Sequence, residues 1–273
     1  MRKRLSSAFV AVVLFFATLY GDSALGYSNL VNYAVALLIF GGLYEIYKPF
    51  NFIRKMPLAI VGAAFGLSIA FGSIRDASFI IVAIIFYMLL MFLIAMAYRK
   101  TVSFSDISIL MFTTIYISLC LAHVGMVNEE PYGAFLIVYM CVGAFMTDSG
   151  AFFVGKFFGK HKLLPEISPK KTVEGSIGGI ITAMVSFAIY ALILMFVFGF
   201  KINWLSFMGI GFISTFLAQA GDLSASMIKR ELNLKDYGSI MPGHGGILDR
   251  LDSLIFVAPL VYYLNLVFPV IMK

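Results

Sequence analysis

The run SFIIVAIIFYMLLMFLIAMA, residues 78–97, holds 20 consecutive residues without a charged side chain. An α-helix rises about 1.5 Å per residue, so this run is about 30 Å long, which matches the hydrocarbon core of a bilayer. Similar runs recur through the 273 residues, which are 61% hydrophobic and 12% charged. A membrane β-barrel would show alternating segments of about ten residues instead. We therefore expect an all-α, polytopic membrane bundle rather than a soluble domain.

Apolar runs bounded by charged or turn residues predict nine membrane spans. They lie near residues 5–20, 29–47, 57–74, 77–98, 104–123, 132–154, 176–199, 204–222 and 250–271. Lys and Arg collect in the cytoplasmic loops of membrane proteins, so their distribution tests this count. With the N-terminus in the cytoplasm, only Arg75, Lys201 and Lys273 of the 20 basic residues fall outside the predicted cytoplasmic segments. We expect a cytoplasmic N-terminus and a C-terminus on the outer side.

The basic start of the chain has two interpretations. Residues 1–26 combine a basic segment, an apolar run and small residues, as a secretory signal peptide does. A retained first span is favoured, since no soluble exported domain follows. The net charge of +6 is also explained by membrane topology, because no basic patch interleaved with aromatic residues indicates nucleic-acid binding.

The polar chemistry is concentrated in the second half of the chain. The predicted segments after the sixth and eighth spans are the long ones, and they carry most of the unusual polar residues. We therefore divide the chain into N-terminal transmembrane helices, residues 1–125, and a C-terminal transmembrane catalytic region, residues 126–273. The catalytic region is expected to form its site at the cytoplasmic face.

Two aspartates approach this face from separate spans. At about 1.5 Å per residue, Asp148 lies about 24 Å along the sixth span and Asp222 about 27 Å along the eighth. A carboxylate inside the apolar slab is costly unless it meets a cation, a partner or water, so each is a functional candidate, with helix packing as the alternative for Asp148. If the eighth span continues as a helix, Ser226, Lys229 and Arg230 share the face of Asp222. That face suits a metal-bound polyphosphate, although the two cations also fit simple membrane anchors.

A third polar approach is the stretch MPGHGGILDRLD, residues 241–252, at the start of the last span. Asp249 and Asp252 are three residues apart and fall on one side of a helix, where capping of the helix dipole is the plain alternative. Glycine backbone at this helix start can bring N–H groups close to phosphate oxygens. The residues concerned are Gly243, Gly245 and Gly246, with His244 between them.

Lysines follow the sixth span in two groups. Lys156, Lys160 and Lys162 are explained equally well as anchors to anionic lipid. Lys170 and Lys171 lie between a proline and a glycine directly before the seventh span, which would hold them near the same cytoplasmic face as the aspartates. Sites for Mg²⁺-dependent nucleotide chemistry usually contain a few carboxylates and several Lys or Arg side chains.

Two stretches carry a resemblance to a known family. SMIKRELNLKDYGSIMPGHGGILDRLDS, residues 226–253, resembles the signature of the phosphatidate cytidylyltransferases, and DSGAFFVGKFFGKHKLLPEISPKKTVEG, residues 148–175, is similar to that family's second block. The first half of the chain agrees in hydropathy and length only. The resemblance implies that CTP and phosphatidic acid are converted to CDP-diacylglycerol and pyrophosphate, with Mg²⁺ as cofactor and room for a second cation.

The resemblance also implies roles for individual residues. The metal ligands are Asp222, Asp249 and Asp148, and Asp252 completes the ligand shell or orients Arg250. Cations neutralise the triphosphate and the lipid phosphate; they are Lys170, Lys171, Lys229, Arg230 and Arg250. His244 donates a hydrogen bond to phosphate in preference to acting as a base, because the attacking phosphate is already an anion. The remaining substrate contacts are assigned to Ser226, Lys156, Gly243, Gly245 and Gly246.

Two other functions stay open at this point. A CTP-dependent lipid or polyprenol kinase would have a similar tail but would transfer the γ-phosphoryl group. A cation-coupled transporter would place its acids near the midplane of the membrane and show inverted repeats, whereas these acids lie at one face. We expect an integral protein of a bacterial inner membrane with its site facing the cytoplasm. The bilayer and the two substrates are its partners, no nucleic acid is bound, and the resemblance allows a homodimer.

Overall fold

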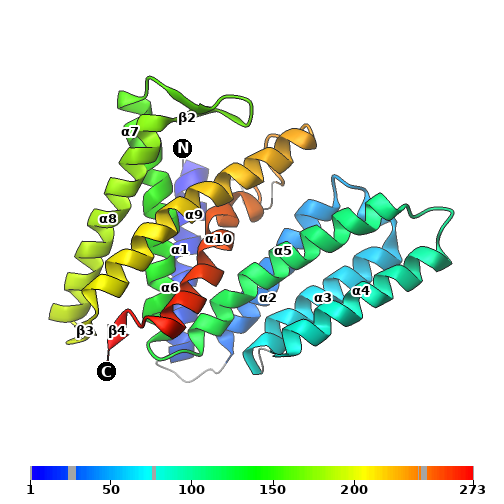
Figure 1. Cartoon of the computed structure of the whole chain (residues 1–273), viewed down its shortest axis with the longest axis horizontal. Helices are drawn as coiled ribbons and strands as arrows, with labels where there is room; N and C mark the ends of the chain where they lie inside the picture. Colours follow the sequence, from blue (N-terminus) through cyan, green and yellow to red (C-terminus); the bar gives the residue numbers. More distant parts are fainter. Residues whose placement is uncertain (1, 24–28, 76–77, 239, 241–244, 273) are drawn as a thin grey trace. The chain divides into compact units, whose positions relative to one another are not determined.

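The computed structural model describes residues 2–23, 29–75, 78–238, 240 and 245–272 (Figure 1). The chain forms two compact units. Unit 1 contains Met1–Glu129 and Asp236–Arg250, and unit 2 contains Glu130–Lys235 and Leu251–Lys273. The described residues 236–238, 240 and 245–247, which precede the last helix, therefore belong with the N-terminal helices in unit 1. The functional division at residue 125 stays a prediction.

In the described part of unit 1, five long helices and one short turn of 3-10 helix precede residue 129. They are α1 (Arg2–Ser23), α2 (Leu30–Tyr47), η1 (Phe52–Arg54), α3 (Met56–Arg75), α4 (Ser78–Ala97) and α5 (Phe104–Asn128). Helices α2, α3 and α5 pack closely because small residues of α3 face them. A Cβ atom on Gly66 would lie 2.8 Å from Leu43 Cδ1, so glycine at this position lets the helices approach each other.

Unit 2 begins with a span that changes its helical geometry twice. Helix α6 (Gly133–Cys141) passes into a π-helix, η2 (Val142–Met146), and then into α7 (Thr147–Phe158). The remaining helices are α8 (Val173–Phe196), α9 (Trp204–Glu231) and α10 (Leu248–Val267), of which the first three residues of α10 belong to unit 1.

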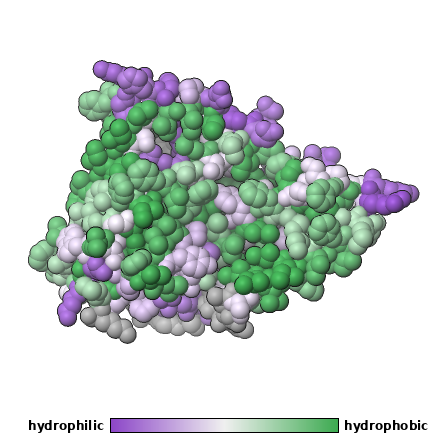
Figure 2. Space-filling model, viewed as in Figure 1, coloured by the Kyte–Doolittle hydropathy of each residue, from purple (hydrophilic) through white to green (hydrophobic). Residues whose placement is uncertain are grey.

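Two short β-ribbons in unit 2 were not expected in an all-α protein. Strand β1 (Lys162–Leu164) pairs antiparallel with β2 (Ser168–Thr172), and β3 (Lys201–Ile202) pairs with β4 (Ile271–Met272). Both ribbons lie beyond helix ends, where pairing between strands satisfies backbone N–H and C=O groups that no helix satisfies. Hydrophilic residues gather around the β1–β2 hairpin, whereas the flanks of the helices are hydrophobic (Figure 2).

The predicted class of fold is confirmed. Within the described residues, eight helical segments are long and apolar enough to cross a membrane, with α6, η2 and α7 forming one 26-residue segment. A helix also occupies the predicted first span, and its described apolar part, Val12–Asp22, is shorter. The direction in which the helices cross the membrane stays a prediction.

The core of unit 2 is aromatic and supports the span that carries Asp148. The hydroxyl of Tyr139 donates to the carbonyl oxygen of Phe207 at 2.6 Å, and both rings pack against each other and near Phe187. Helices α7 and α8 lie side by side (Figure 1) and approach through glycines. A Cβ on Gly155 would lie 3.4 Å from the Cα of Gly175. This close packing holds α7 and the hairpin that follows it against α8.

Candidate active site

Three of the predicted aspartates meet in unit 2, each from a different helix. Asp148 lies in the first turn of α7, Asp222 in α9 and Asp252 in α10. The hydroxyl of Ser253 donates to Asp148 Oδ2 at 2.7 Å, which joins α10 to α7. Asp252 is 8% exposed and interacts electrostatically with Asp222, Asp148 and Lys229. We refer to Asp148, Asp222 and Asp252 as the carboxylate cluster.

The π-helix determines how Asp148 is presented. It ends two residues before Asp148, and the buried hydroxyl of Thr147 donates to the carbonyl oxygen of Gly143 at 2.6 Å. A π-turn inserts an extra residue into an α-helix, so every side chain after it is rotated relative to a regular helix. Such turns are frequent at functional sites. The hydrophobic pattern of the sixth span did not reveal it.

A lysine already neutralises one member of the carboxylate cluster. The Nζ of Lys171, at the end of β2, lies 2.6 Å from Asp222 Oδ2, with the two side chains 24% and 28% exposed. Lys170 is exposed beside it. The hairpin therefore brings a cation to α9.

Helix α9 continues past Asp222 as far as Glu231, so Asp222, Ser226, Lys229 and Arg230 follow one another at helical spacing. Ser226 is buried, and Lys229 interacts electrostatically with Asp252. The guanidinium Nε of Arg230 donates to the carbonyl oxygen of Ile167 at 3.3 Å. Arg230 thus ties the end of α9 to the hairpin that carries Lys171.

Lys156 is not one of the residues in the contacts described above. It is exposed near the end of α7, with its Nζ 5.8 Å from the centre of the Phe157 ring. Exposed aromatic and basic side chains at a helix end are typical of the membrane interface. Its substrate-binding role stays a prediction, and its position also fits a lipid anchor.

The Asp249 carboxylate binds two backbone N–H groups that precede α10 in the chain. Its Oδ2 accepts hydrogen bonds from the backbone N–H of Tyr237 at 2.9 Å and of Gly246 at 3.0 Å, within unit 1. Gly245 has a φ of 86°, a conformation that favours glycine, and it lies against this carboxylate. The metal-binding role of Asp249 stays a prediction. The predicted roles of Gly243 and His244 lie outside the described residues.

Sequence reasoning missed Glu45. This residue lies in α2, is 1% exposed, and accepts hydrogen bonds from the N–H groups of Ile247 at 2.9 Å and Leu248 at 3.0 Å. Protein carboxylates therefore accept hydrogen bonds from backbone N–H groups at the helix start that we expected to contact phosphate, including the N–H of Gly246. The available signal was a lone glutamate within an apolar run, LLIFGGLYEIY, which is the criterion that singled out Asp148.

The carboxylates of unit 2 are oxygen donors of the chemical type that Mg²⁺ binds. Within the ranges that the structure describes, no three His, Cys, Asp or Glu side chains are arranged to hold a metal by themselves. Mg²⁺ does not require such a cage, because it is usually bound by one or two carboxylates together with substrate phosphates and water. Asp148, Asp222 and Asp252 supply hard oxygen donors of the required kind.

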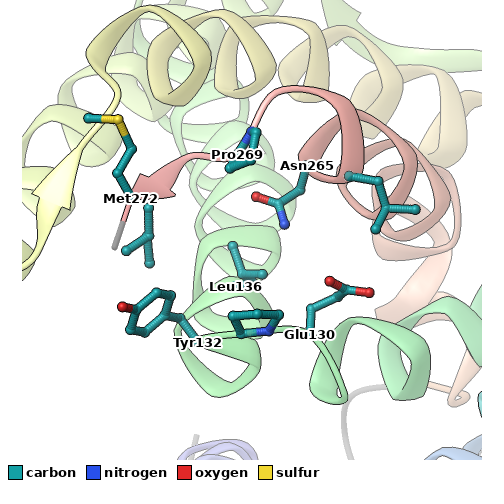
Figure 3. A pocket seen from close by; sticks show the side chains of 9 residues that line it. Glu130, Tyr132, Leu136, Asn265, Pro269 and Met272 are labelled. Atoms are coloured by element: carbon teal, nitrogen blue, oxygen red, sulfur yellow. The ribbon is translucent and has the colours of Figure 1, made fainter.

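A cavity of about 400 Å³ in unit 2 lies away from the carboxylate cluster (Figure 3). Its lining includes Glu130, Tyr132 and Asn265, together with apolar side chains from both ends of the unit's sequence. Asn265 and Asp252 are both in α10, and the 1.5 Å rise per residue separates them by about 20 Å. None of the predicted site residues that the structure describes lines this cavity.

Comparison with known proteins agrees with the chemistry of these residues. The sequence model of the Cytidylyltransferase family matches residues 2–268. The chain is 41% identical over 185 residues to a phosphatidate cytidylyltransferase of Bacillus subtilis (strain 168), a match that covers 67% of each chain. It is 38% identical over 163 residues to a phosphatidate cytidylyltransferase of Staphylococcus aureus (strain COL), covering 60% of each chain. These matches thus span about 60% to two thirds of the relatives' length. The chain belongs to the cytidylyltransferase family.

Proposed function

We propose that the protein transfers the cytidylyl group of CTP to phosphatidic acid and releases pyrophosphate. The observation that carries this proposal is the carboxylate cluster of unit 2, with the Lys171 cation against Asp222, inside a bundle of apolar helices. The relatives named phosphatidate cytidylyltransferase support the same substrates.

The proposed reaction needs charge neutralisation more than proton transfer. An oxygen of the lipid phosphate attacks the α-phosphorus of CTP, so a new P–O bond forms while the bond to the β-phosphate oxygen breaks and pyrophosphate leaves. Because the attacking oxygen is already an anion, no general base is required. Positioning and electrostatic stabilisation of the phosphates then account for most of the catalysis.

Carboxylates and cations divide this work. Asp222, Asp148 and Asp252 would hold Mg²⁺, with Asp249 as a further predicted ligand. The metal would act as a Lewis acid and neutralise phosphate charge when bound. Lys171 would exchange part of its contact with Asp222 for a phosphate oxygen. Further neutralisation is proposed for the exposed or half-buried cations of the same segments, namely Lys170, Lys229, Arg230 and Arg250.

The location of the protein in the membrane suits the two substrates. CTP is a water-soluble polyanion, and the headgroup of phosphatidic acid lies at the bilayer surface, so both meet where water and membrane touch. We place the protein in a bacterial inner membrane with the site on the cytoplasmic side, in accordance with the distribution of Lys and Arg. A homodimer remains part of this proposal and can be tested by native mass spectrometry.

Position-specific labelling tests the proposed reaction. Purified protein would be incubated with phosphatidic acid, Mg²⁺ and CTP labelled at either the α or the γ phosphate. We expect label to enter the lipid from the α position only. Transfer from the γ position would indicate a lipid kinase, and no transfer from either would exclude both reactions; either result would refute the proposal.

A further inference from the structure

Glu45 has an unusual environment for a carboxylate within a membrane helix. It lies near the end of α2, is almost fully buried, and belongs to an apolar run. A buried carboxylate in such a segment is costly unless hydrogen bonds compensate it, and it commonly marks function. Its partners are backbone N–H groups of Ile247 and Leu248, about 200 residues later in the chain.

Two described glycines between α9 and α10 leave room for this side chain. A Cβ on Gly238 would lie 2.5 Å from Glu45 Oε1, and a Cβ on Gly246 would collide with the same carboxylate. Only residues without a side chain fit at these two positions with Glu45 in place. Gly246, which the sequence suggested as a phosphate contact, therefore makes room for a protein carboxylate.

Glu45 and Asp249 each accept two backbone hydrogen bonds, three of them from residues 246–248 at the start of α10 and one from Tyr237 earlier in the chain. Glu45 takes the N–H groups of Ile247 and Leu248, and Asp249 takes those of Gly246 and Tyr237. The two carboxylates repel each other, and each is held in place by its own pair of donors. Because Glu45 belongs to α2 rather than to the loop, it alone of the two attaches the loop to the helical body of unit 1.

We propose that Glu45 is a positioning residue for the reaction: it fixes the start of α10 and thereby the orientation of the Asp249 carboxylate. This inference rests on the proposed function, in which Asp249 is a metal ligand. Glu45 touches no substrate, since its side chain is buried against the protein's own backbone. Its effect is exerted through the amides of Ile247 and Leu248.

The substitution Glu45→Gln tests this role with little change of shape. Glutamine keeps one oxygen acceptor, but its NH₂ group faces the second backbone N–H, so one hydrogen bond is lost and two donors meet. Hydrogen bonds to charged groups are strong enough that we expect amide exchange at residues 246–248 to rise by about tenfold or more. We expect kcat to fall by about tenfold or more, with KM for CTP changed by less than about threefold.

Tyr47→Phe is the matched control. Tyr47 is buried in the same helix and bonds the hydroxyl of Thr114, so its loss perturbs the core of unit 1 without touching the loop. Both kcat and the exchange of residues 246–248 should stay near the wild-type values in this variant. Glu45→Asp, which keeps the charge but shortens the side chain, should recover part of the activity that Glu45→Gln loses.

Each outcome decides for or against the proposal. Wild-type kcat in Glu45→Gln, or reduced kcat with unchanged exchange at residues 246–248, would overturn it. General unfolding in both Glu45 variants, or equal losses in Tyr47→Phe, would assign Glu45 a purely structural role and overturn it as well. If the wild-type protein transfers no label, the proposed function fails, whereas the exchange measurement still shows whether Glu45 fixes the loop.

Discussion

The ion pair between Lys171 and Asp222 predicts that activity and stability respond very differently to one substitution. We consider Lys171→Met, which removes the cation and keeps much of the side chain's apolar length. The pair is 2.6 Å long, but both side chains are about a quarter exposed, so water screens it. Partly exposed pairs contribute about 0.2–1 kcal/mol, and we expect the loss of stability to remain within that range.

A second ion pair with the same geometry supplies the control. Lys55 Nζ lies 2.6 Å from Asp106 Oδ2 in unit 1, with side-chain exposures of 27% and 23%. Lys55→Met should therefore cost the same stability as Lys171→Met. For a protein of this size, about 1 kcal/mol corresponds to a shift in Tm of about 2–4 °C, which a thermal melt in detergent resolves.

The two variants should differ in catalysis. If Lys171 stabilises phosphate charge in the transition state, its removal should lower kcat/KM by about 100-fold or more, as the loss of one preorganised donor commonly does. Lys55→Met should stay within about twofold of the wild type in the α-label transfer assay. Activity of Lys171→Met within about threefold of the wild type, or equal losses in both variants, would refute the argument.

Three further predictions concern the last helix and the metal. Asp249→Asn keeps an oxygen that can accept from the Gly246 amide, so folding should persist while turnover falls by about 100-fold or more in the same transfer assay; near-normal turnover would mean that Asp249 is no metal ligand. Gly245→Ala places a side chain on a backbone with φ of 86°, which should lower the free energy of unfolding by about 1 kcal/mol or more and therefore lower Tm. The control is Gly209→Ala, at a helical position with open space around it, which should not lower Tm. Chelation of divalent cations should abolish label transfer and added Mg²⁺ should restore it; transfer that continues in excess chelator would count against a metal-dependent reaction.

Regularly spaced features were predictable from the sequence. The apolar runs determined which segments are helices, because a helix that lacks charged residues over about 20 positions has no stable place outside the bilayer or a protein core. The face formed by Asp222, Ser226 and Lys229 followed from helical periodicity once α9 continued beyond the apolar run. The approach of Asp148 to the same end of unit 2 followed from the rise per residue.

Features that depend on distant partners were not predictable in this way. The π-helix before Asp148 leaves the hydropathy pattern almost unchanged, although it rotates every later side chain of that span. The β-ribbons form because the segments between helices must satisfy the hydrogen bonds of their backbone N–H and C=O groups. No short sequence motif predicts which of these strands pair with each other.

The difference is clearest at the start of α10. The sequence by itself determined that glycines precede an apolar helix, that two aspartates lie near its start, and that such a helix start attracts negative charge. Only the tertiary structure decided which negative charge occupies it, because Glu45 reaches the amides of Ile247 and Leu248 from a helix about 200 residues away. The local sequence pattern shows where a helix begins and so where its free backbone N–H groups lie. Which side chain accepts hydrogen bonds from these groups depends on how distant helices pack together.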